Sequence, residues 1–342
     1  MRVVRIGSLV SLRIRPRALL ATGGCVLVAV LFGLYTIGRG DYPMSLGEVL
    51  DTIAGHGTPT QDFIVNEVRL PRVVAALSVG AALGLAGAVF QSLVRNPLGS
   101  PDLLGFTQGA ATGALLVVIA GGGTMALAGG AVLGGLATGV VVYALAWRGG
   151  APGFRLILVG IGVSAMLTGV NGYLLTRGKL TEAARALLWL TGSLDGRGWA
   201  QVVPLLVVLA VLAPIVVLGC GRALRVIEMG DDTAAAVGVR VERTRLTALA
   251  GAVVLASFAA ATAGPVGFVA LTAPQLAQRL TRAPGPNLVP AACVGAALMV
   301  SADWIAQRAF AAHRLPVGVV TGLLGGGYLV WLLARQRKAG RI

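Results

Sequence analysis

Apolar residues along the chain gather in ten long runs, which short polar stretches separate. Most runs hold about 20 residues, the length that an α-helix needs to cross the hydrocarbon core of a bilayer. The runs lie at about residues 18–37, 73–94, 103–120, 125–146, 156–176, 201–220, 246–263, 265–280, 288–307 and 316–334. This pattern predicts an all-α polytopic membrane protein with about ten transmembrane helices.

Two of these runs differ from an ordinary span. The first follows the basic residues Arg13, Arg15 and Arg17 and resembles the start of a signal peptide. It is long, and no clear small-residue cleavage site follows it, so we interpret it as an anchored span. The run at 265–280 is short and opens at Gly264-Pro265, which favours a broken helix.

The polar stretches divide the chain around a single transmembrane domain. We expect a basic N-terminal segment at 1–17, the transmembrane domain at 18–335 and a basic tail at 336–342. Three connecting segments exceed a simple turn, namely 38–70, 177–200 and 221–245. The segment 177–200 contains Trp189 and Trp199, which is typical of a short interfacial helix with aromatic anchors.

The positive charges favour one orientation in the membrane. An even number of spans puts both termini on the same side. If that side is the cytoplasm, 19 Lys and Arg residues lie inside against 9 outside, and the acidic residues split as 5 inside and 8 outside. Cytoplasmic loops of membrane proteins carry an excess of Lys and Arg. We therefore expect both termini and the segment 221–245 in the cytoplasm.

The composition supports a membrane protein and excludes other classes. Of 342 residues, 56% are apolar and 12% charged, whereas a soluble domain has about 25% charged residues. The net charge of +15 does not indicate nucleic acid, because the basic residues fall between apolar runs and only 5% of residues are aromatic. The cysteines, Cys25, Cys220 and Cys293, lack metal-ligand spacing, so we expect no metal and no cofactor.

The sequence contains no recognisable catalytic motif, so we do not expect an enzyme. His56 and His313 fall in predicted outer loops, and Gly178-Lys179 lacks the other residues of a phosphate loop. Gradient-driven carriers usually place ionisable residues at mid-membrane. The spans here are nearly free of them, and Asp303 lies near a helix end. This pattern favours a transporter that borrows a partner ATPase, and a gradient-driven secondary carrier is the alternative.

The segment 228–239 predicts a short helix in the long cytoplasmic loop. Asp231 or Asp232 can cap its N-terminus, the alanines at 234–236 favour a helix, and Gly238 suits its C-terminal end. Such a helix has a small, flat face that fits a cleft on another protein. An ordinary connecting helix explains the same residues.

The motif Arg69-Leu70-Pro71-Arg72 is expected to open the second span on the outer face. Pro71 suits the first helical turn, and arginines three residues apart share one helix face. Cations at a helix N-terminus oppose the helix dipole, so a local stabilising role is not expected. The arginines predict either a basic contact for an acidic partner or snorkelling interface anchors. Arg308, at the outer end of the ninth span, can join them or pair with Asp303.

Glycines four residues apart occur in several runs, and this spacing is typical of close helix packing in membranes. The pairs are Gly80/Gly84, Gly109/Gly113, Gly130/Gly134, Gly135/Gly139 and Gly318/Gly322. They indicate packing, and they are too common to indicate a substrate.

Beyond these local patterns, the sequence resembles the FecCD family over about residues 20–335. Members of this family are permease subunits of bacterial ATP-binding-cassette (ABC) importers for ferric siderophores, haem and cobalamin. The resemblance rests on six motifs in the family's order. They are Arg69-Leu70-Pro71-Arg72; the stretch 91–105 with Asn96-Pro97-Leu98 and Ser100-Pro101; the stretch 189–194; Met229-Gly230-Asp231 with Val237-Gly238-Val239; the stretch 263–268; and Leu315-Pro316-Val317-Gly318.

The resemblance implies a type II ABC importer permease fold in the bacterial plasma (inner) membrane. Two permeases would enclose one path for a ferric siderophore, with two cytoplasmic ATPases and an extracytoplasmic substrate-binding protein as further partners. Arg69, Arg72 and Arg308 would contact acidic residues of the binding protein. The residues that couple to the ATPase would be Glu228, Met229, Gly230, Asp231, Asp232, Ala235 and Gly238. The fifth, eighth and tenth helices would lie near the path.

Three places depart from the family pattern. The family commonly has Pro-His and, three residues after the His, an arginine, where this chain has Pro274, Gln275 and Gln278. Arg314 replaces the usual acidic residue before Leu-Pro, and the glycines at 325–327 replace a Gly-x-Pro. The glutamine variant resembles one of two unequal partner permeases, so the resemblance favours a heterodimer with a second FecCD-type permease.

Overall fold

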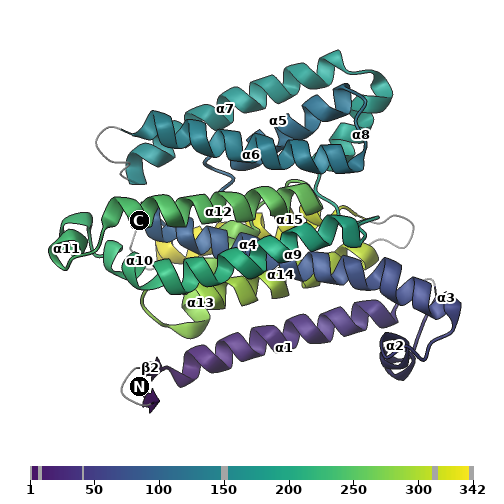
Figure 1. Ribbon diagram of the computed structural model, residues 1–342, viewed down its shortest axis with the longest axis horizontal. Helices are drawn as coiled ribbons and strands as arrows, with labels where there is room; N and C mark the ends of the chain where they lie inside the picture. Colours follow the sequence, from purple (N-terminus) through teal and green to yellow (C-terminus); the bar gives the residue numbers. More distant parts are fainter. Residues whose placement is uncertain (1, 7–9, 41, 148–152, 310–314, 339–342) are drawn as a thin grey trace.

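The computed structural model describes residues 2–6, 10–40, 42–147, 153–309 and 315–338, which form a helical bundle preceded by a small β-hairpin (Figure 1). The elements of the first half are β1 (Arg2–Ile6), β2 (Val10–Ile14), α1 (Pro16–Gly38), α2 (Leu46–Ile53), α3 (Pro59–Asp62), the π-helix η1 (Phe63–Arg69), α4 (Leu70–Val94), α5 (Phe106–Ile119), α6 (Thr124–Ala146) and α7 (Gly153–Arg177). The second half contains α8 (Leu180–Leu190), α9 (Trp199–Pro214), the π-helix η2 (Ile215–Cys220), α10 (Gly221–Ile227), α11 (Asp231–Ala236), α12 (Val241–Ala263), α13 (Val269–Thr281), α14 (Leu288–Arg308) and α15 (Val317–Lys338).

Each of the ten apolar runs forms a helix, so the prediction of about ten transmembrane helices is confirmed. Seven helical segments are long and apolar enough to cross a membrane, judged by length and composition. They are α1, the continuous segment from α3 to α4, α6, α7, the continuous segment from α9 to α10, α12 and α14. α5 and residues Val317–Leu332 of α15 are shorter apolar helices, and α13 has 13 residues. The antiparallel β1–β2 hairpin was not predicted and precedes the first span.

The second span begins earlier than expected. Its helix starts at Pro59, because Thr58 and Gln61 form a reciprocal capping box in which each side chain bonds the other residue's backbone N–H. Pro71 lies inside the resulting helical segment of 36 residues. The π-helical turn of η1 directly precedes Pro71, and the Leu70 N–H bonds the Val65 carbonyl. A wider turn at this point makes room for the proline ring, which otherwise collides with the preceding turn.

The break expected at Gly264-Pro265 is present. α12 ends at Ala263, Gly264 has φ +74°, and α13 starts only at Val269 after Phe268, whose φ is also positive. The short helix expected in 177–200 is α8, but its tryptophan is not an interface anchor. Trp189 is buried within the bundle, and the Trp199 indole N–H donates to the Asn66 carbonyl.

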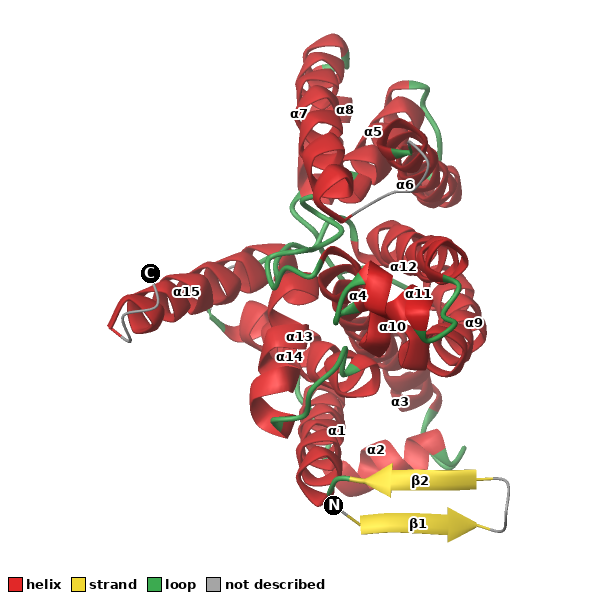
Figure 2. Ribbon diagram, turned by 90° about the vertical axis from the view of Figure 1, so that its left-hand side faces the viewer, coloured by secondary structure: helices red, strands yellow, loops and turns green. Residues whose placement is uncertain are grey.

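α4 is the central helix of the bundle (Figure 2). In the α3–α4 segment, 83% of the most apolar stretch is buried, against 11% for α1. α4 packs against α12, α13 and α14, whereas α5, α6, α7 and α8 form a group on one side of it. The side chains of α1 that face outward are apolar, as expected of a helix that faces lipid.

The glycine pairs pack helices closely, as predicted, with one exception. A Cβ on Gly80 would overlap the Gly295 carbonyl of α14, and a Cβ on Gly113 would overlap the Gly130 carbonyl of α6. Gly322 has open space around it and does not contribute. Small residues at these crossings let two backbones approach where a side chain would separate them.

Candidate functional site

The candidate residues fall into two clusters at opposite ends of α4. Figure 1 shows α10 and α11 at one end of the bundle, which we call the α11 end, and α2, α3 and α8 at the other, which we call the α8 end. Arg72 lies in the first turn of α4, towards the α8 end, and Arg95 directly follows its last residue. The structure therefore separates the predicted docking arginines from the predicted coupling segment by the length of a membrane span.

Arg72 forms a buried ion pair with Asp303 of α14. The Arg72 Nε lies 3.0 Å from the Asp303 Oδ2, and the Arg72 Nη2 lies 2.8 Å from the Asp303 Oδ1, so the pair is bidentate. The Asp303 side chain is 1% exposed and that of Arg72 14%. Gln307 donates a further hydrogen bond to Asp303, 2.7 Å long. Arg72 also pairs with Asp195 in the loop after α8, whose carboxylate is 45% exposed.

Arg69 is half-buried and holds the segment that follows α1. Its guanidinium donates to the carbonyls of Ile37 and Tyr42, at 2.6 and 2.7 Å. The side chain lies so close to Gly40 that a Cβ there would approach the guanidinium to 2.7 Å. Arg69 therefore shapes the α8 end through backbone hydrogen bonds.

Arg308 is exposed at the same end. Its guanidinium lies over the rings of Tyr35 and Trp304, with centroid distances of 5.4 and 5.6 Å. Asp303 pairs with Arg72 instead, so the alternative that Arg308 pairs with Asp303 is wrong. Of the three predicted docking arginines, Arg308 is the one that presents its charge to solvent, whereas Arg72 is already neutralised by two carboxylates.

The predicted coupling segment contains the short helix α11, and its ends differ from expectation. The helix begins after Gly230, which has φ +123°, and no side chain caps its N-terminus. Asp231 and Asp232 lie in its first turn, so the expected capping role is wrong, although both acids still complement the helix dipole. Gly238 has φ +82° and ends the segment, as predicted.

Asp231 forms ion pairs with arginines from two spanning helices, α12 and α4. Its Oδ2 lies 2.9 Å from the guanidinium of Arg245 in α12 and 3.8 Å from that of Arg95 at the end of α4. Arg245 is 2% exposed and also pairs with Glu242. These ion pairs join α11 to the ends of two spanning helices.

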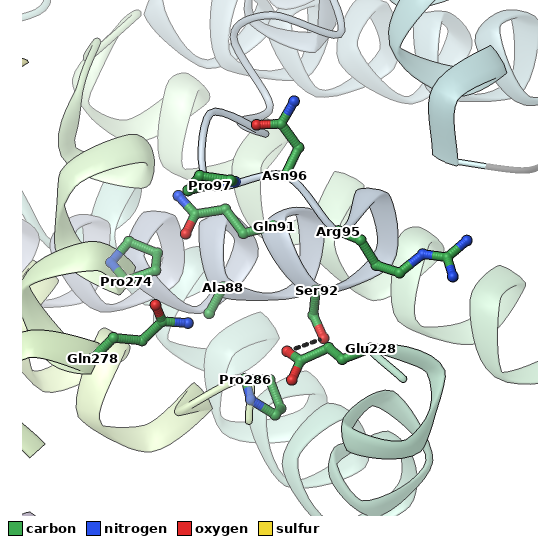
Figure 3. Close-up of a pocket in the computed structure, with 10 residues that line it drawn as sticks. All are labelled: Ala88, Gln91, Ser92, Arg95, Asn96, Pro97, Glu228, Pro274, Gln278 and Pro286. Carbon is green, nitrogen blue, oxygen red and sulfur yellow. Dashed lines mark hydrogen bonds between the residues drawn. The ribbon is translucent and has the colours of Figure 1, made fainter. Parts of the chain in front are cut away.

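Glu228 does not belong to α11 but to the turn before it. Its carboxylate accepts a 2.8 Å hydrogen bond from the Ser92 hydroxyl of α4, and both residues line a cavity of about 350 Å³ (Figure 3). Burial raises the pKa of the Glu228 carboxyl above its ordinary value, and the Ser92 hydrogen bond and the Arg225 charge offset this only in part. The turn is thus joined to α4 by the hydrogen bond between Ser92 and a carboxyl group whose pKa is raised.

The remaining residues of the segment face outward. Met229, Asp232, Ala235 and Gly238 are exposed, and Val237 next to them is exposed as well. Met229 and Val237 are thus large apolar side chains on the exposed face of this segment.

The glutamines that depart from the family pattern also lie at the α11 end. The Gln275 side-chain amide donates to the Pro97 carbonyl at 2.8 Å, which joins α13 to the turn after α4. Gln278 lines the same cavity as Glu228 (Figure 3). A neutral amide thus stands at each of these positions.

Sequence reasoning missed Arg245 and Asp195. Arg245 stands one residue before an apolar run, and an arginine at the edge of a span that ends up buried marks a special contact. Asp195 lies two residues after Gly192-Ser193 in a loop and carries no comparable pattern. Its pairing with Arg72 depends on the fold, because 123 residues separate the two.

Comparison with known proteins gives consistent results over nearly the whole chain. The sequence model of the FecCD transport family matches residues 26–335. The ferric enterobactin transport system permease protein FepG of Escherichia coli (strain K12) is 44% identical and covers 96% of this chain and 98% of its own length. The probable siderophore transport system permease protein YfhA of Bacillus subtilis (strain 168) is 35% identical, covering 85% of this chain and 88% of its own.

A solved structure has the same fold. It is described as an inward-facing conformation of a metal-chelate type ABC transporter, and it superposes on this chain with a TM-score of 0.81. The sequences are 26% identical, and the match covers 93% of this chain and 99% of the other.

Proposed function

The chain belongs to the FecCD transport family, and on this basis we propose that it is the permease subunit of an ABC importer for a ferric siderophore. The similarity over almost its full length to a ferric enterobactin permease carries the proposal. Several further relatives are named for siderophores or ferric citrate, and one for hemin. This balance favours a ferric siderophore over haem.

The α11 end is proposed to face the cytoplasm and to bind an ATPase subunit. The excess of Lys and Arg in the predicted inner segments supports this orientation. The exposed residues around α11 would enter a cleft on the ATPase, and Asp231 and Arg245 would carry its movement into α12. Ser92 and Glu228 would carry the same movement into α4.

A second FecCD-type permease is proposed to complete the substrate path, and a heterodimer is favoured. α7 and α15 expose large apolar side chains, among them Met166 and Leu323, which a second permease or lipid can cover. Gln275 and Gln278 supply the argument for an unequal partner, because the family commonly has ionisable residues at both positions.

The α8 end is proposed to receive a substrate-binding protein. Arg308 offers an exposed cation, and Asp195 is the exchangeable partner of Arg72, because a carboxylate of the binding protein can replace it. Arg69 would position this surface through its backbone hydrogen bonds.

Arg308→Glu should weaken docking of the binding protein, and the loss of affinity should be largest at low salt. Arg282→Glu, at the α11 end, is the control.

No observation favours the gradient-driven carrier. Among the acidic residues that the structure describes, Asp303 is the one whose side chain is buried, and Arg72 binds it in a bidentate pair. A carboxylate held in this way does not provide a free site for a coupling ion.

Affinity purification in mild detergent tests the proposal. The tagged protein should recover an ATPase with a phosphate loop and a second ten-span permease, both identified by mass spectrometry. Recovery of two copies of this chain with the ATPase would replace the heterodimer by a homodimer. Recovery of this chain alone, still able to move solute without ATP, would overturn the importer proposal.

A further inference from the structure

A second and larger cavity lies at the α11 end, on the side of the bundle that faces away from α5 to α8. It encloses about 660 Å³ between the start of α1, helix α10 and the turn from α13 to α14. Its charged residues are Arg15, Arg222 and Arg225, and its apolar wall includes Leu19 and Val217. Arg225 also acts on the Glu228 carboxyl described above, whereas the other four residues take no part in the clusters at the ends of α4.

None of the three arginines forms a salt bridge with a carboxylate in the described part of the chain. Glu228 is electrostatically coupled to Arg225, but its carboxylate bonds Ser92 instead. The turn at Gly285 fits closely against the Arg225 side chain, because a Cβ there would lie 2.8 Å from Nε. The cavity therefore gathers three positive charges on one wall, and the Gly285 turn packs against one of them.

The cavity also lies where membrane spans end. α1 begins at Pro16, and the long apolar segment of α9 and α10 ends at Ile227, so both spans terminate beside the arginines. Leu19 and Leu218 are exposed and apolar, as expected of residues that face hydrocarbon. One wall of the cavity is thus basic and the other continues into a lipid-facing surface.

We propose that this cavity binds one anionic phospholipid. The guanidinium groups of Arg15, Arg222 and Arg225 bind its phosphate and headgroup, and its acyl chains lie along Leu19 and Val217. Guanidinium forks match phosphate oxygens, and basic pockets between the cytoplasmic ends of spanning helices suit anionic headgroups. A zwitterionic lipid leaves the excess positive charge unneutralised. A soluble phosphate leaves the apolar wall uncovered.

Native mass spectrometry of the full chain tests this site with phosphatidylglycerol as the probe. The variant Arg222→Gln/Arg225→Gln removes two cavity charges. The control Arg240→Gln/Arg243→Gln removes two exposed arginines with the same spacing in the same segment, 221–245, outside the cavity. The cavity variant should retain the first phosphatidylglycerol about ten- to thirtyfold more weakly than wild type. The control variant should bind it like wild type.

Two further arms separate the lipid from other ligands. Phosphatidylethanolamine should bind the wild type more weakly than phosphatidylglycerol, and glycerol phosphate should not displace the lipid. Equal retention of phosphatidylglycerol by both double variants would overturn the proposal, as would displacement by glycerol phosphate. Loss of a copurified ATPase from the cavity variant with lipid binding unchanged would assign the arginines to a protein partner instead.

Discussion

Arg72 and Arg69 stand three residues apart, yet the structure gives them different partners. Asp303 holds Arg72 inside the bundle, and two backbone carbonyls hold Arg69 beside the segment after α1. A buried carboxylate needs a cation and further hydrogen bonds, and Arg72 with Gln307 supplies them for Asp303. Arg72 is therefore first a structural residue that joins α4 to α14 and to the loop at Asp195.

Removing Arg72 should destabilise the protein strongly. Arg72→Gln leaves the Asp303 carboxylate buried without its cation, and breaking such a pair costs about 3–5 kcal/mol. Thermal unfolding in detergent should show a large fall in Tm. Arg308→Gln, which removes an exposed cation at the same end, is the control and should change Tm little. Equal Tm values for Arg72→Gln and wild type would show that the pair contributes nothing.

The half-buried carboxyl of Glu228 should make stability depend on pH. Burial raises its pKa above the ordinary value of 4.5, so the folded protein binds this proton more tightly than the unfolded chain does. The associated stabilisation is fully present below the ordinary pKa and is lost as pH rises through the raised pKa. Glu228→Gln keeps an acceptor for Ser92 and removes the titration. The stability of Glu228→Gln relative to wild type should therefore rise as pH increases from the ordinary pKa of Glu228 through its raised pKa in the folded protein.

Thermal unfolding at a series of pH values measures this difference. Glu67→Gln removes an exposed carboxylate of η1 and serves as the control. A difference between Glu228→Gln and wild type that stays constant across the pH series would mean that Glu228 does not contribute to the pH dependence.

α11 contacts two spanning helices at once, and these contacts set its position. Asp231 reaches both Arg245 of α12 and Arg95 after α4, while Ser92 holds the preceding turn. A short helix of six residues has little stability of its own. Its position is therefore set by these contacts.

Arg245→Gln should loosen the coupling between ATP hydrolysis and transport. The substitution removes the charge that joins α11 to α12, whereas Arg243→Gln removes an exposed arginine two residues away. In assembled complexes, the solute moved per ATP hydrolysed should fall severalfold for the first variant only. An unchanged ratio would show that this ion pair does not transmit the movement.

The crossing of α5 and α6 offers a direct test of glycine packing. Gly130 faces Gly113, and a Cβ there would lie 2.6 Å from the Gly113 carbonyl, whereas the neighbouring Gly129 faces open space. Gly130→Leu should lower stability by about 1–3 kcal/mol or more, because the helices must separate. Gly129→Leu has the same helix propensity and should be tolerated. Similar Tm values for both variants would contradict the packing account.

The sequence predicted the spanning helices well, because a run of about 20 apolar residues has few alternatives in a membrane. It misplaced the start of the second span, since Thr58 and Gln61 begin the helix within a polar segment. The pairing of Arg72 with Asp303 was also out of reach, because 231 residues separate them and neither residue type specifies the other. Surface arginines and buried ones look alike until the fold is known.

The whole molecule places its two clusters at the two ends of the central helix. The α8 end carries Arg72 and Arg308, and the α11 end carries the exposed helix with its links to α4 and α12. α4 is buried along nearly its whole length, so neither end can shift without repacking its neighbours. This arrangement suits a permease that receives substrate at one end and responds to an ATPase at the other.

Uptake of radioactive ferric siderophore into proteoliposomes tests this account most directly. The vesicles contain the chain with its partner permease and ATPase, and the binding protein is added outside. The account predicts uptake that requires ATP on the ATPase side and continues when a protonophore collapses the ion gradient. Uptake that proceeds without ATP and stops with the protonophore would contradict it.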